Sequence, residues 1–258
     1  MATADLKDIE GIVLREFKYK ESSKIIEVFT KDLGKISINC QSVLKQNSKN
    51  LSLTNRFILA SFTLFRSGKD FYGLREGLVL NPYYKSNKNF DIILYKSAIS
   101  DLLLRTIDQI QIETVFTLLK NSFEAFENAE SNHINIFLGF LLKYISFSGF
   151  KPNFKTCGIC GKNIRGKYLY FSANESSAIC DGCKDMVRDK VLLTYDELVY
   201  FNKLLYTKTS ELELIKKVSN YQKIGKIIID YCLKNLDLGI YPSLEWVKKA
   251  LERNVNVF

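Results

Sequence analysis

Cys157-Gly-Ile-Cys160 and Cys180-Asp-Gly-Cys183 are two motifs separated by nineteen residues, and they are the most constrained feature of this chain. Two close cysteine pairs at this spacing are typical of a tetrahedral, structural zinc site in a short ribbon. In each pair the two intervening residues allow both thiolates to turn toward one metal ion. We therefore predict that Cys157, Cys160, Cys180 and Cys183 bind one structural zinc ion.

Other cysteine chemistries explain less of this pattern. Two structural disulfides would require an oxidising compartment, whereas the first residues contain early acids and no apolar signal segment. A redox Cys-x-x-Cys would account for only one pair, and an iron–sulfur cluster stays an alternative. A catalytic zinc ion usually keeps an open coordination position and includes histidine or carboxylate among its ligands. The only histidine is His133, far away in the sequence, so a structural metal is the better interpretation.

The chain around these motifs has the composition of a globular protein with a hydrophobic core. It contains 258 residues, of which 47% are hydrophobic and 25% are charged. This length suffices for one large domain or two to three small ones. The longest apolar runs, such as 136–142, are too short to span a bilayer. We therefore expect a cytoplasmic protein without membrane contact, in which Cys40 and Cys232 are buried as apolar side chains.

The first eighty residues have the pattern of β-strands. Five segments alternate between apolar and polar residues or are rich in β-branched and aromatic residues, namely 11–17, 24–30, 35–40, 56–65 and 71–80. A polar stretch, 41–55, separates the third segment from the fourth. Three strands, an interruption and two further strands match the order of strands in a five-stranded OB barrel. An SH3-like barrel would give a similar order of strands along the sequence.

After residue 82 the apolar spacing becomes helical. It predicts helices over 90–110, 112–126 and 134–147, a strand over 167–172 between the cysteine pairs, and helices over 194–206, 221–236 and 243–253. Thr194 and Glu197 form a capping-box pattern at the start of the fourth helix. We predict an α+β fold in which a helical bundle carries an inserted four-cysteine zinc ribbon. Its parts are an OB-fold domain (1–81), a helical domain (82–156 and 184–258) and the zinc insertion (157–183).

The charge distribution suggests a polyanionic partner. The formal net charge is +9, and residues 1–80 contain 13 basic against 9 acidic residues. OB surfaces bind strands through basic residues that follow phosphates and aromatic residues that stack on bases. Lys35 and Arg56 rank highest because they flank the polar stretch between strands. The candidate DNA-binding residues are Arg15, Lys18, Lys20, Lys24, Lys35, Lys45, Arg56, Arg66, Lys69 and Arg75, and, beside the cysteines, Lys155, Lys162, Arg165 and Lys167.

Each of these candidates has an ordinary alternative. A basic residue on a lysine-rich surface is often no more than a solvated charge. Phe17, Tyr19 and Phe71 could stack on bases, but Phe17 and Phe71 are more often core residues of a barrel. His133 is best interpreted as a surface or capping residue. Because the sequence has neither a phosphate-binding glycine motif nor a recognisable nucleophile–base set, we expect no enzymatic activity.

Three segments resemble the bacterial recombination mediator family RecO. Residues 11–36, beginning Gly11-Ile-Val-Leu-Arg-Glu-Phe17, are similar to the opening strands of that family. Residues 140–161, ending Thr156-Cys-Gly-Ile-Cys-Gly161, are similar to its helix leading into the first cysteine pair, and Tyr170-Phe-Ser172 is similar to its middle strand. The resemblance covers roughly residues 9–250.

The resemblance implies a non-enzymatic DNA-binding protein of recombinational DNA repair, associated with the nucleoid in the cytoplasm. RecO-like proteins bind single- and double-stranded DNA and anneal complementary strands. With a RecR-like partner and single-stranded-DNA-binding protein (SSB), they help load the recombinase onto SSB-coated strands. Two other hypotheses stay open: a protein-interaction scaffold with incidental DNA binding, and a nucleic-acid-modifying enzyme with a structural zinc ribbon.

Overall fold

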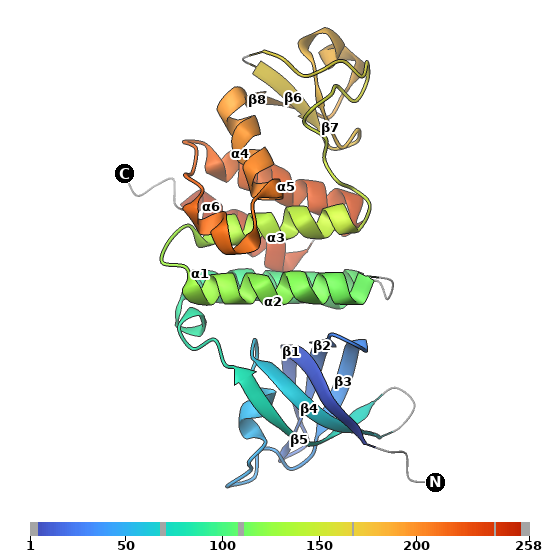
Figure 1. Cartoon of the computed structure of the whole chain (residues 1–258), viewed down its shortest axis with the longest axis vertical. Coiled ribbons are helices and arrows are strands. Elements are labelled where there is room, and N and C mark those ends of the chain that lie inside the picture. Colours follow the sequence, from blue (N-terminus) through green and yellow to red (C-terminus); the bar gives the residue numbers. More distant parts are fainter. Residues whose placement is uncertain (1–4, 68–70, 108–110, 167, 240, 254–258) are drawn as a thin grey trace. The chain divides into compact units, whose positions relative to one another are not determined.

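A computed structural model describes residues 5–67, 71–107, 111–166, 168–239 and 241–253. The chain forms two compact units, Met1–Glu127 and Asn128–Phe258 (Figure 1). The first unit contains a β-barrel and two long helices, and the second contains the remaining helices and the four-cysteine ribbon. The helices predicted over 90–110 and 112–126 thus belong to the same unit as the strands. The finer division into 1–81, 82–156, 157–183 and 184–258 stays a prediction.

The barrel consists of five strands in the order β1-β2-β3-β5-β4, and it is closed by pairing between β1 and β4. The pairing of β3 with β5 is parallel, and the other pairings are antiparallel. This is the OB-fold topology, as predicted. The strands are β1 (Leu6–Tyr19), β2 (Ser23–Thr30), β3 (Gly34–Cys40), β4 (Leu59–Arg66) and β5 (Tyr72–Asn81), with the short helix η1 (Leu51–Thr54) between β3 and β4.

Strand alternation explains how the barrel fills its interior. In β3, Ile36, Ile38 and Cys40 are buried, whereas Lys35, which points to the opposite face, is exposed. Burial also raises the pKa of the Cys40 thiol to about 12, with Lys24 opposing it, so this cysteine behaves as the apolar side chain that was predicted.

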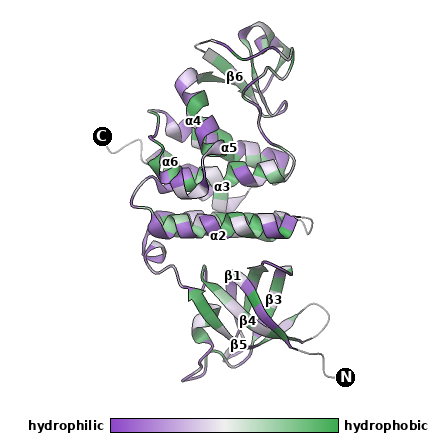
Figure 2. Ribbon diagram, in the orientation of Figure 1, coloured by the Kyte–Doolittle hydropathy of each residue, from purple (hydrophilic) through white to green (hydrophobic). Residues whose placement is uncertain are grey.

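The first unit also contains η2 (Ser86–Lys88), α1 (Phe90–Thr106) and α2 (Ile112–Asn128). The Asn89 side chain caps α1 by accepting hydrogen bonds from two backbone N–H groups of its first turn. Figure 2 shows hydrophobic and hydrophilic residues interspersed along α2, which buries Phe116 and Phe123 on one face. Phe116 lies against Phe29 of the barrel, with ring centroids 6.1 Å apart. The two helices therefore share a core with the barrel.

The second unit is built on α3 (His133–Phe147), which is buried along most of its length. Around it lie α4 (Tyr195–Tyr206), η5 (Thr209–Leu214) and α5 (Tyr221–Asn235), and α6 (Pro242–Arg253) packs on α5. The ribbon contributes the sheet β7-β6-β8, formed by β6 (Tyr168–Ser172), β7 (Ser177–Ile179) and β8 (Lys190–Thr194), and the short helix η4 (Asp181–Met186). Among the described residues, no helix is both long enough and apolar enough to cross a membrane.

The predicted helices and strands are present, β7 and β8 were not predicted, and two corrections of detail follow. β4 starts at Leu59 rather than at Arg56, because Phe57 has a positive φ of 68° that interrupts a strand. Phe17 and Phe71 are not barrel core, since their side chains are 45% and 44% exposed. The strand expected over 167–172 is β6, and Lys167 lies outside the described residues. The predicted capping box is present: Thr194 and Glu197 exchange side chain–backbone hydrogen bonds.

Candidate metal centre and nucleic-acid interface

The four predicted metal ligands lie together in the ribbon of the second unit. Their Sγ atoms are all within 4.8 Å of one another, and the Cys160 and Cys180 sulfurs are 3.8 Å apart. Four sulfurs at about 2.3 Å from a tetrahedral zinc ion lie about 3.8 Å from each other. The cluster therefore has the size that such an ion requires, and Cys157 and Cys183 complete a shell of four donors.

Charge explains why this cluster suits a cation. Burial raises the pKa of the Cys157 thiol, but hydrogen bonds from the backbone of Cys180, Cys160 and Ile159 outweigh burial and lower the pKa to about 6. The pKa of Cys183 rises to about 12, because this thiol is hydrogen-bonded to the Cys180 thiol, is buried, and contacts the other two thiols. Four neighbouring thiolates cannot all be ionised unless a positive ion lies between them, and a divalent metal supplies that charge.

The ribbon is attached to the helices of its unit through aromatic side chains. The Phe154 ring lies 4.7 Å from that of Phe201 on α4, and the Phe171 ring lies 5.5 Å from those of Phe201 and Tyr231. The Tyr231 hydroxyl on α5 donates a hydrogen bond of 2.7 Å to the carbonyl of Phe150. The four-cysteine cluster therefore belongs to a segment whose aromatic side chains pack against α4 and α5.

Lys35 and Arg56, the highest-ranked DNA-binding candidates, both contact α1. The Lys35 Nζ donates to the Leu104 carbonyl at 2.7 Å, near the C-terminal end of that helix. An Arg56 Nη lies 3.4 Å from the Ser97 hydroxyl. Burial lowers the pKa of Arg56, and the nearby Asp101 carboxylate opposes this effect. These two side chains have a structural role in joining the barrel to α1, which sequence reasoning did not detect.

Three further candidates form ion pairs within the first unit, and a fourth falls outside the described residues. Arg15 binds Asp101 of α1 at 2.7 Å, which neutralises the charge that it would offer to a phosphate. The pairs are Arg15–Asp101, Arg15–Glu27, Lys24–Glu16 and Arg75–Asp5. Lys69 is the candidate whose placement is not described.

The other four barrel candidates lie at one end of the barrel. Lys18, Lys20, Lys45 and Arg66 are exposed, and none of them forms an ion pair with a residue that the structure describes. The loop after β3 reaches the β1–β2 turn, because the Leu44 N–H donates to the Ser22 carbonyl at 2.8 Å. Arg66 pairs with Tyr72 at the start of β5, and β5 there pairs with the end of β3. We call these four residues the basic end of the barrel.

Exposed aromatic side chains accompany the basic end. Tyr19 is 41% exposed, and Lys20 lies over its ring at 5.3 Å from the centroid. Phe17 and Phe71 are exposed to a similar degree. Cross-strand pairing places Phe17 opposite Ile25, and Ile25 opposite Asn39 of β3, so Asn39 joins this surface although it was not among the predicted residues. The OB fold uses the same region, namely strands 2 and 3 with the adjoining loops, to bind oligonucleotides.

The basic candidates of the ribbon are exposed, and their side chains form no ion pair with a residue that the structure describes. Lys155, Lys162 and Arg165 have solvent-exposed side chains. The Lys162 carbonyl accepts a hydrogen bond from the N–H of Cys157 at 2.8 Å, so this lysine lies beside the metal centre. Lys167 lies outside the described residues. The ribbon therefore has a basic edge of three described residues.

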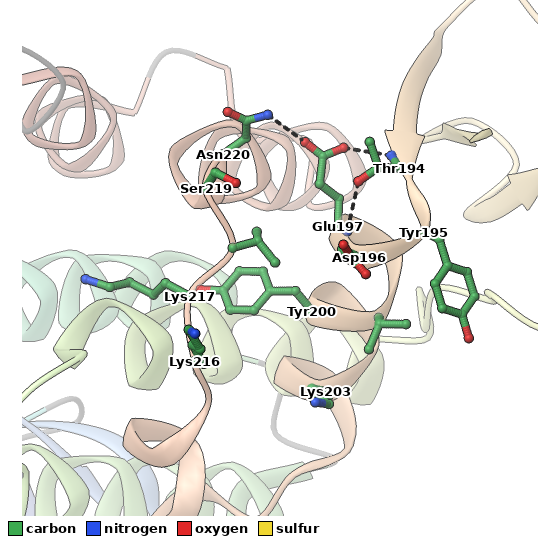
Figure 3. A pocket seen from close by; sticks show the side chains of 12 residues that line it. Thr194, Tyr195, Asp196, Glu197, Tyr200, Lys203, Lys216, Lys217, Ser219 and Asn220 are labelled. Atoms are coloured by element: carbon green, nitrogen blue, oxygen red, sulfur yellow. Dashed lines mark hydrogen bonds between the residues drawn. The ribbon is translucent and has the colours of Figure 1, made fainter. Parts of the chain in front are cut away.

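A polar groove of about 760 Å³ between α4 and the segment after η5 was not predicted (Figure 3). Lys203, Lys216 and Lys217 line it. Burial raises the pKa of the Glu197 carboxyl, but hydrogen bonds from Lys223 and Thr194 outweigh it and lower the pKa. The Glu197 carboxylate is already neutralised by Lys223 at 2.9 Å, so the remaining charged residues of the lining are the three lysines and Asp196.

Fold and site together define a class: a two-unit OB-fold protein in which a helical unit carries a four-cysteine ribbon. The model of the family described as Recombination protein O N terminal matches residues 4–83, and the model described as Recombination protein O C terminal matches residues 88–245. The chain therefore belongs to the recombination protein O (RecO) family, which confirms the resemblance found in the sequence.

Curated relatives resemble the chain over nearly its whole length. The DNA repair protein RecO of Caldanaerobacter subterraneus subsp. tengcongensis is 26% identical over 242 residues, covering 93% of this chain and 96% of the relative. That of Clostridium novyi is 28% identical over 245 residues, covering 94% and 91%. That of Mycoplasma mycoides subsp. mycoides is 25% identical over 229 residues, covering 87% and 90%.

Proposed function

We propose that this chain is a DNA-binding mediator of recombinational DNA repair. The basic end of the barrel carries the proposal. Four exposed basic side chains, which form no ion pair with a described residue, and three exposed aromatic rings lie on the strands and loops that bind oligonucleotides in OB folds. Membership of the RecO family supports it, as do relatives named DNA repair proteins. In this proposal the four-cysteine centre holds zinc and has no catalytic role.

The proposed mechanism uses charge rather than bond chemistry. Lysine and arginine side chains neutralise phosphates of single- or double-stranded DNA, so that two complementary strands lose much of their mutual repulsion and anneal without nucleotide hydrolysis. Aromatic rings hold the bases unstacked and available for pairing. With a RecR-like protein and SSB as partners, the protein then helps load the recombinase at the nucleoid, in the cytoplasm.

Neutralising the basic end tests the proposal. We expect Lys18→Gln, Lys20→Gln, Lys45→Gln and Arg66→Gln together to weaken single-stranded DNA binding by about a hundredfold at ~0.1 M salt. The slope of log affinity against log salt should fall by about 2 to 3, because each lost phosphate contact contributes about 0.7. Fluorescence anisotropy over a salt series measures both quantities.

The matched control neutralises exposed lysines elsewhere in the first unit. Lys31→Gln with Lys88→Gln removes charge away from the basic end and should change the affinity by no more than about twofold. Equal losses in both variants would show that only the overall charge matters. Unchanged DNA binding in the fourfold variant would favour the protein-interaction scaffold, and the proposed role of the barrel would be wrong.

The aromatic side chains give a second test. Phe17→Ala and Phe71→Ala should each cost about 1–3 kcal/mol in single-stranded DNA binding, as expected for a ring that stacks on a base. Double-stranded DNA should be affected less, because its bases are already paired and stacked. Because both rings are nearly half exposed, thermal unfolding should be almost unchanged. Comparing the two variants with Phe90→Ala, a ring on α1 that is 77% exposed, separates stacking from a general loss of apolar surface.

A further inference from the structure

A cavity of about 320 Å³ lies in the first unit at the junction of the barrel with the helices. Its wall consists of the polar or charged residues Ser52, Asn55, Arg56, Tyr84 and Asn87 and the apolar residues Ile58, Val79 and Pro82. No carboxylate lines this cavity. The Tyr84 side chain is 73% exposed and stands at its edge. The cavity thus has a mixed apolar and polar wall with one cationic residue and no carboxylate, and an aromatic ring borders it.

Arg56 forms no ion pair with a carboxylate among the described residues. Its Nε atom is buried and has no hydrogen-bond partner, and its guanidinium lies within ion-pair distance of no carboxylate that the structure describes. The carboxylates of Asp101 and Glu16 act on the Arg56 charge, but they are already paired with Arg15 and Lys24. A half-buried guanidinium normally has an anionic partner, because desolvation of an unpaired charge is costly.

The buried side chain of Lys96 contacts a residue of the same cavity wall. Lys96 is fully buried, and its Nζ donates to the Asn87 side-chain oxygen at 3.0 Å. The Phe57 ring lies between the two cations, 4.5 Å from the Arg56 guanidinium carbon and 5.9 Å from the Lys96 nitrogen. The nearest carboxylate to Lys96, that of Glu127, reaches it only through the Ser86 hydroxyl. Neither Arg56 nor Lys96 therefore forms an ion pair with a carboxylate that the structure describes.

We propose that this cavity binds a phosphate group, of a nucleotide or of a phosphorylated DNA end. The Arg56 guanidinium would supply the planar fork of donors that suits phosphate oxygens. Asn55 and Ser52 add neutral donors, and Tyr84 offers a face on which the attached base can stack. The site is separate from the basic end of the barrel, so its occupancy does not depend on the proposed strand binding.

Direct titration tests the proposal. Isothermal titration of the full-length protein with inorganic phosphate, at constant ionic strength, should give saturable binding at one site. Arg56→Gln should weaken that binding by about tenfold or more, whereas Lys31→Gln, outside both the cavity and the basic end, should leave it unchanged. The same titration with a deoxynucleoside 5′-monophosphate, and with one oligonucleotide carrying either a 5′-phosphate or a 5′-hydroxyl, distinguishes the two sources of the group.

A second variant covers the case in which Arg56→Gln destabilises the unit. Asn55→Asp places a carboxylate in the cavity wall beside Arg56, where it would act as a built-in counter-ion. We expect this variant to unfold about 2–4 °C above the wild type and to lose phosphate binding. Asn47→Asp, on an exposed loop outside the cavity, is the matched control and should show neither effect.

The results that would support the phosphate site differ from those that would overturn it. Phosphate binding that Arg56→Gln and Asn55→Asp both abolish supports the site, even if strand binding at the basic end fails. Absence of saturable phosphate binding in the wild type, or binding that Asn55→Asp leaves intact, overturns the proposal. Equal affinity for 5′-phosphate and 5′-hydroxyl oligonucleotides, together with tight binding of the mononucleotide, assigns the cavity to free nucleotides rather than to strand ends.

Discussion

Replacing Cys183 with serine is expected to unfold the four-cysteine ribbon and to leave the barrel unit folded. The buried core around the metal centre consists of Cys157, Ile179, Cys183 and Val187, so half of its members are metal ligands. Structural zinc contributes about 10–16 kcal/mol in small domains, which exceeds what so few apolar residues supply. Hydrogen exchange should therefore become fast in β6, β7 and β8, and bound zinc should fall from one ion per chain to none.

Chelation of the wild-type protein should give the same result. Exchange should also rise in α4 and α5, because Phe171 of the ribbon packs against Phe201 and Tyr231 of these helices. Cys232→Ala is the control, since Cys232 is buried in the helical unit away from the metal centre. If the metal-free ribbon keeps its slow exchange, the metal does not hold this segment together, and the structural interpretation of the site is wrong.

Lys96→Ala is expected to destabilise the first unit by about 2–4 kcal/mol, the usual cost of truncating a large buried side chain. The Lys96 ammonium lies 4.9 Å from the ring centroids of both Tyr83 and Phe123, and truncation would leave a cavity between these rings. Lys96→Met keeps the volume and replaces a buried charge by an apolar group, so its cost at neutral pH should be under about 1.5 kcal/mol. Urea unfolding of the two variants gives both values.

The pH dependence of stability distinguishes the charge of Lys96 from its packing. Burial lowers the pKa of Lys96 to about 7, with the Glu127 carboxylate opposing. Above pH ~7 and up to the ordinary lysine pKa of about 10.4, the unfolded chain holds a proton that the native state lacks. Native stability therefore rises with pH in this window, by at most about 1.4 kcal/mol per pH unit.

Lys96→Met removes this titration, so the wild type should gain stability relative to the variant between pH 7.5 and pH 9. Lys88→Ala, an exposed lysine on η2, should follow the wild type at both pH values. A constant difference between the wild type and Lys96→Met across the window would mean that Lys96 stays protonated in the native protein. The aromatic rings and Glu127 would then stabilise its charge more strongly than burial opposes it.

Several features could be predicted because they depend on neighbouring residues. The alternation in β3 and the polar interruption after it predicted the OB order, and the Thr194–Glu197 spacing predicted the capping box that begins α4. The two Cys-x-x-Cys motifs predicted a cluster whose sulfurs lie within 4.8 Å of one another. In each case a short stretch of chain fixes both the residue types and their separation, so little else is needed to specify the geometry.

Which basic side chains form contacts within the protein, and which stay exposed, could not be predicted in this way. Nothing near Lys35 or Arg56 in the sequence indicates that α1 lies beside them, because their partners Leu104 and Ser97 are 69 and 41 residues away. For the same reason the sequence did not identify Lys96 as buried, or Phe17 as exposed. A positive formal charge is therefore a poor guide to which lysines and arginines remain available for DNA.

The amino-acid sequence alone determined the order of the elements, the cysteine ligands and the family, since periodicity and motif spacing are local properties of the chain. The tertiary structure alone decided which charges are neutralised internally, which stay at the basic end of the barrel, and that Lys96 is buried while Arg56 is partly buried. The physical reason is that the electrostatic free energy of a side chain depends on its burial and on partners from distant segments, and only folding brings these together.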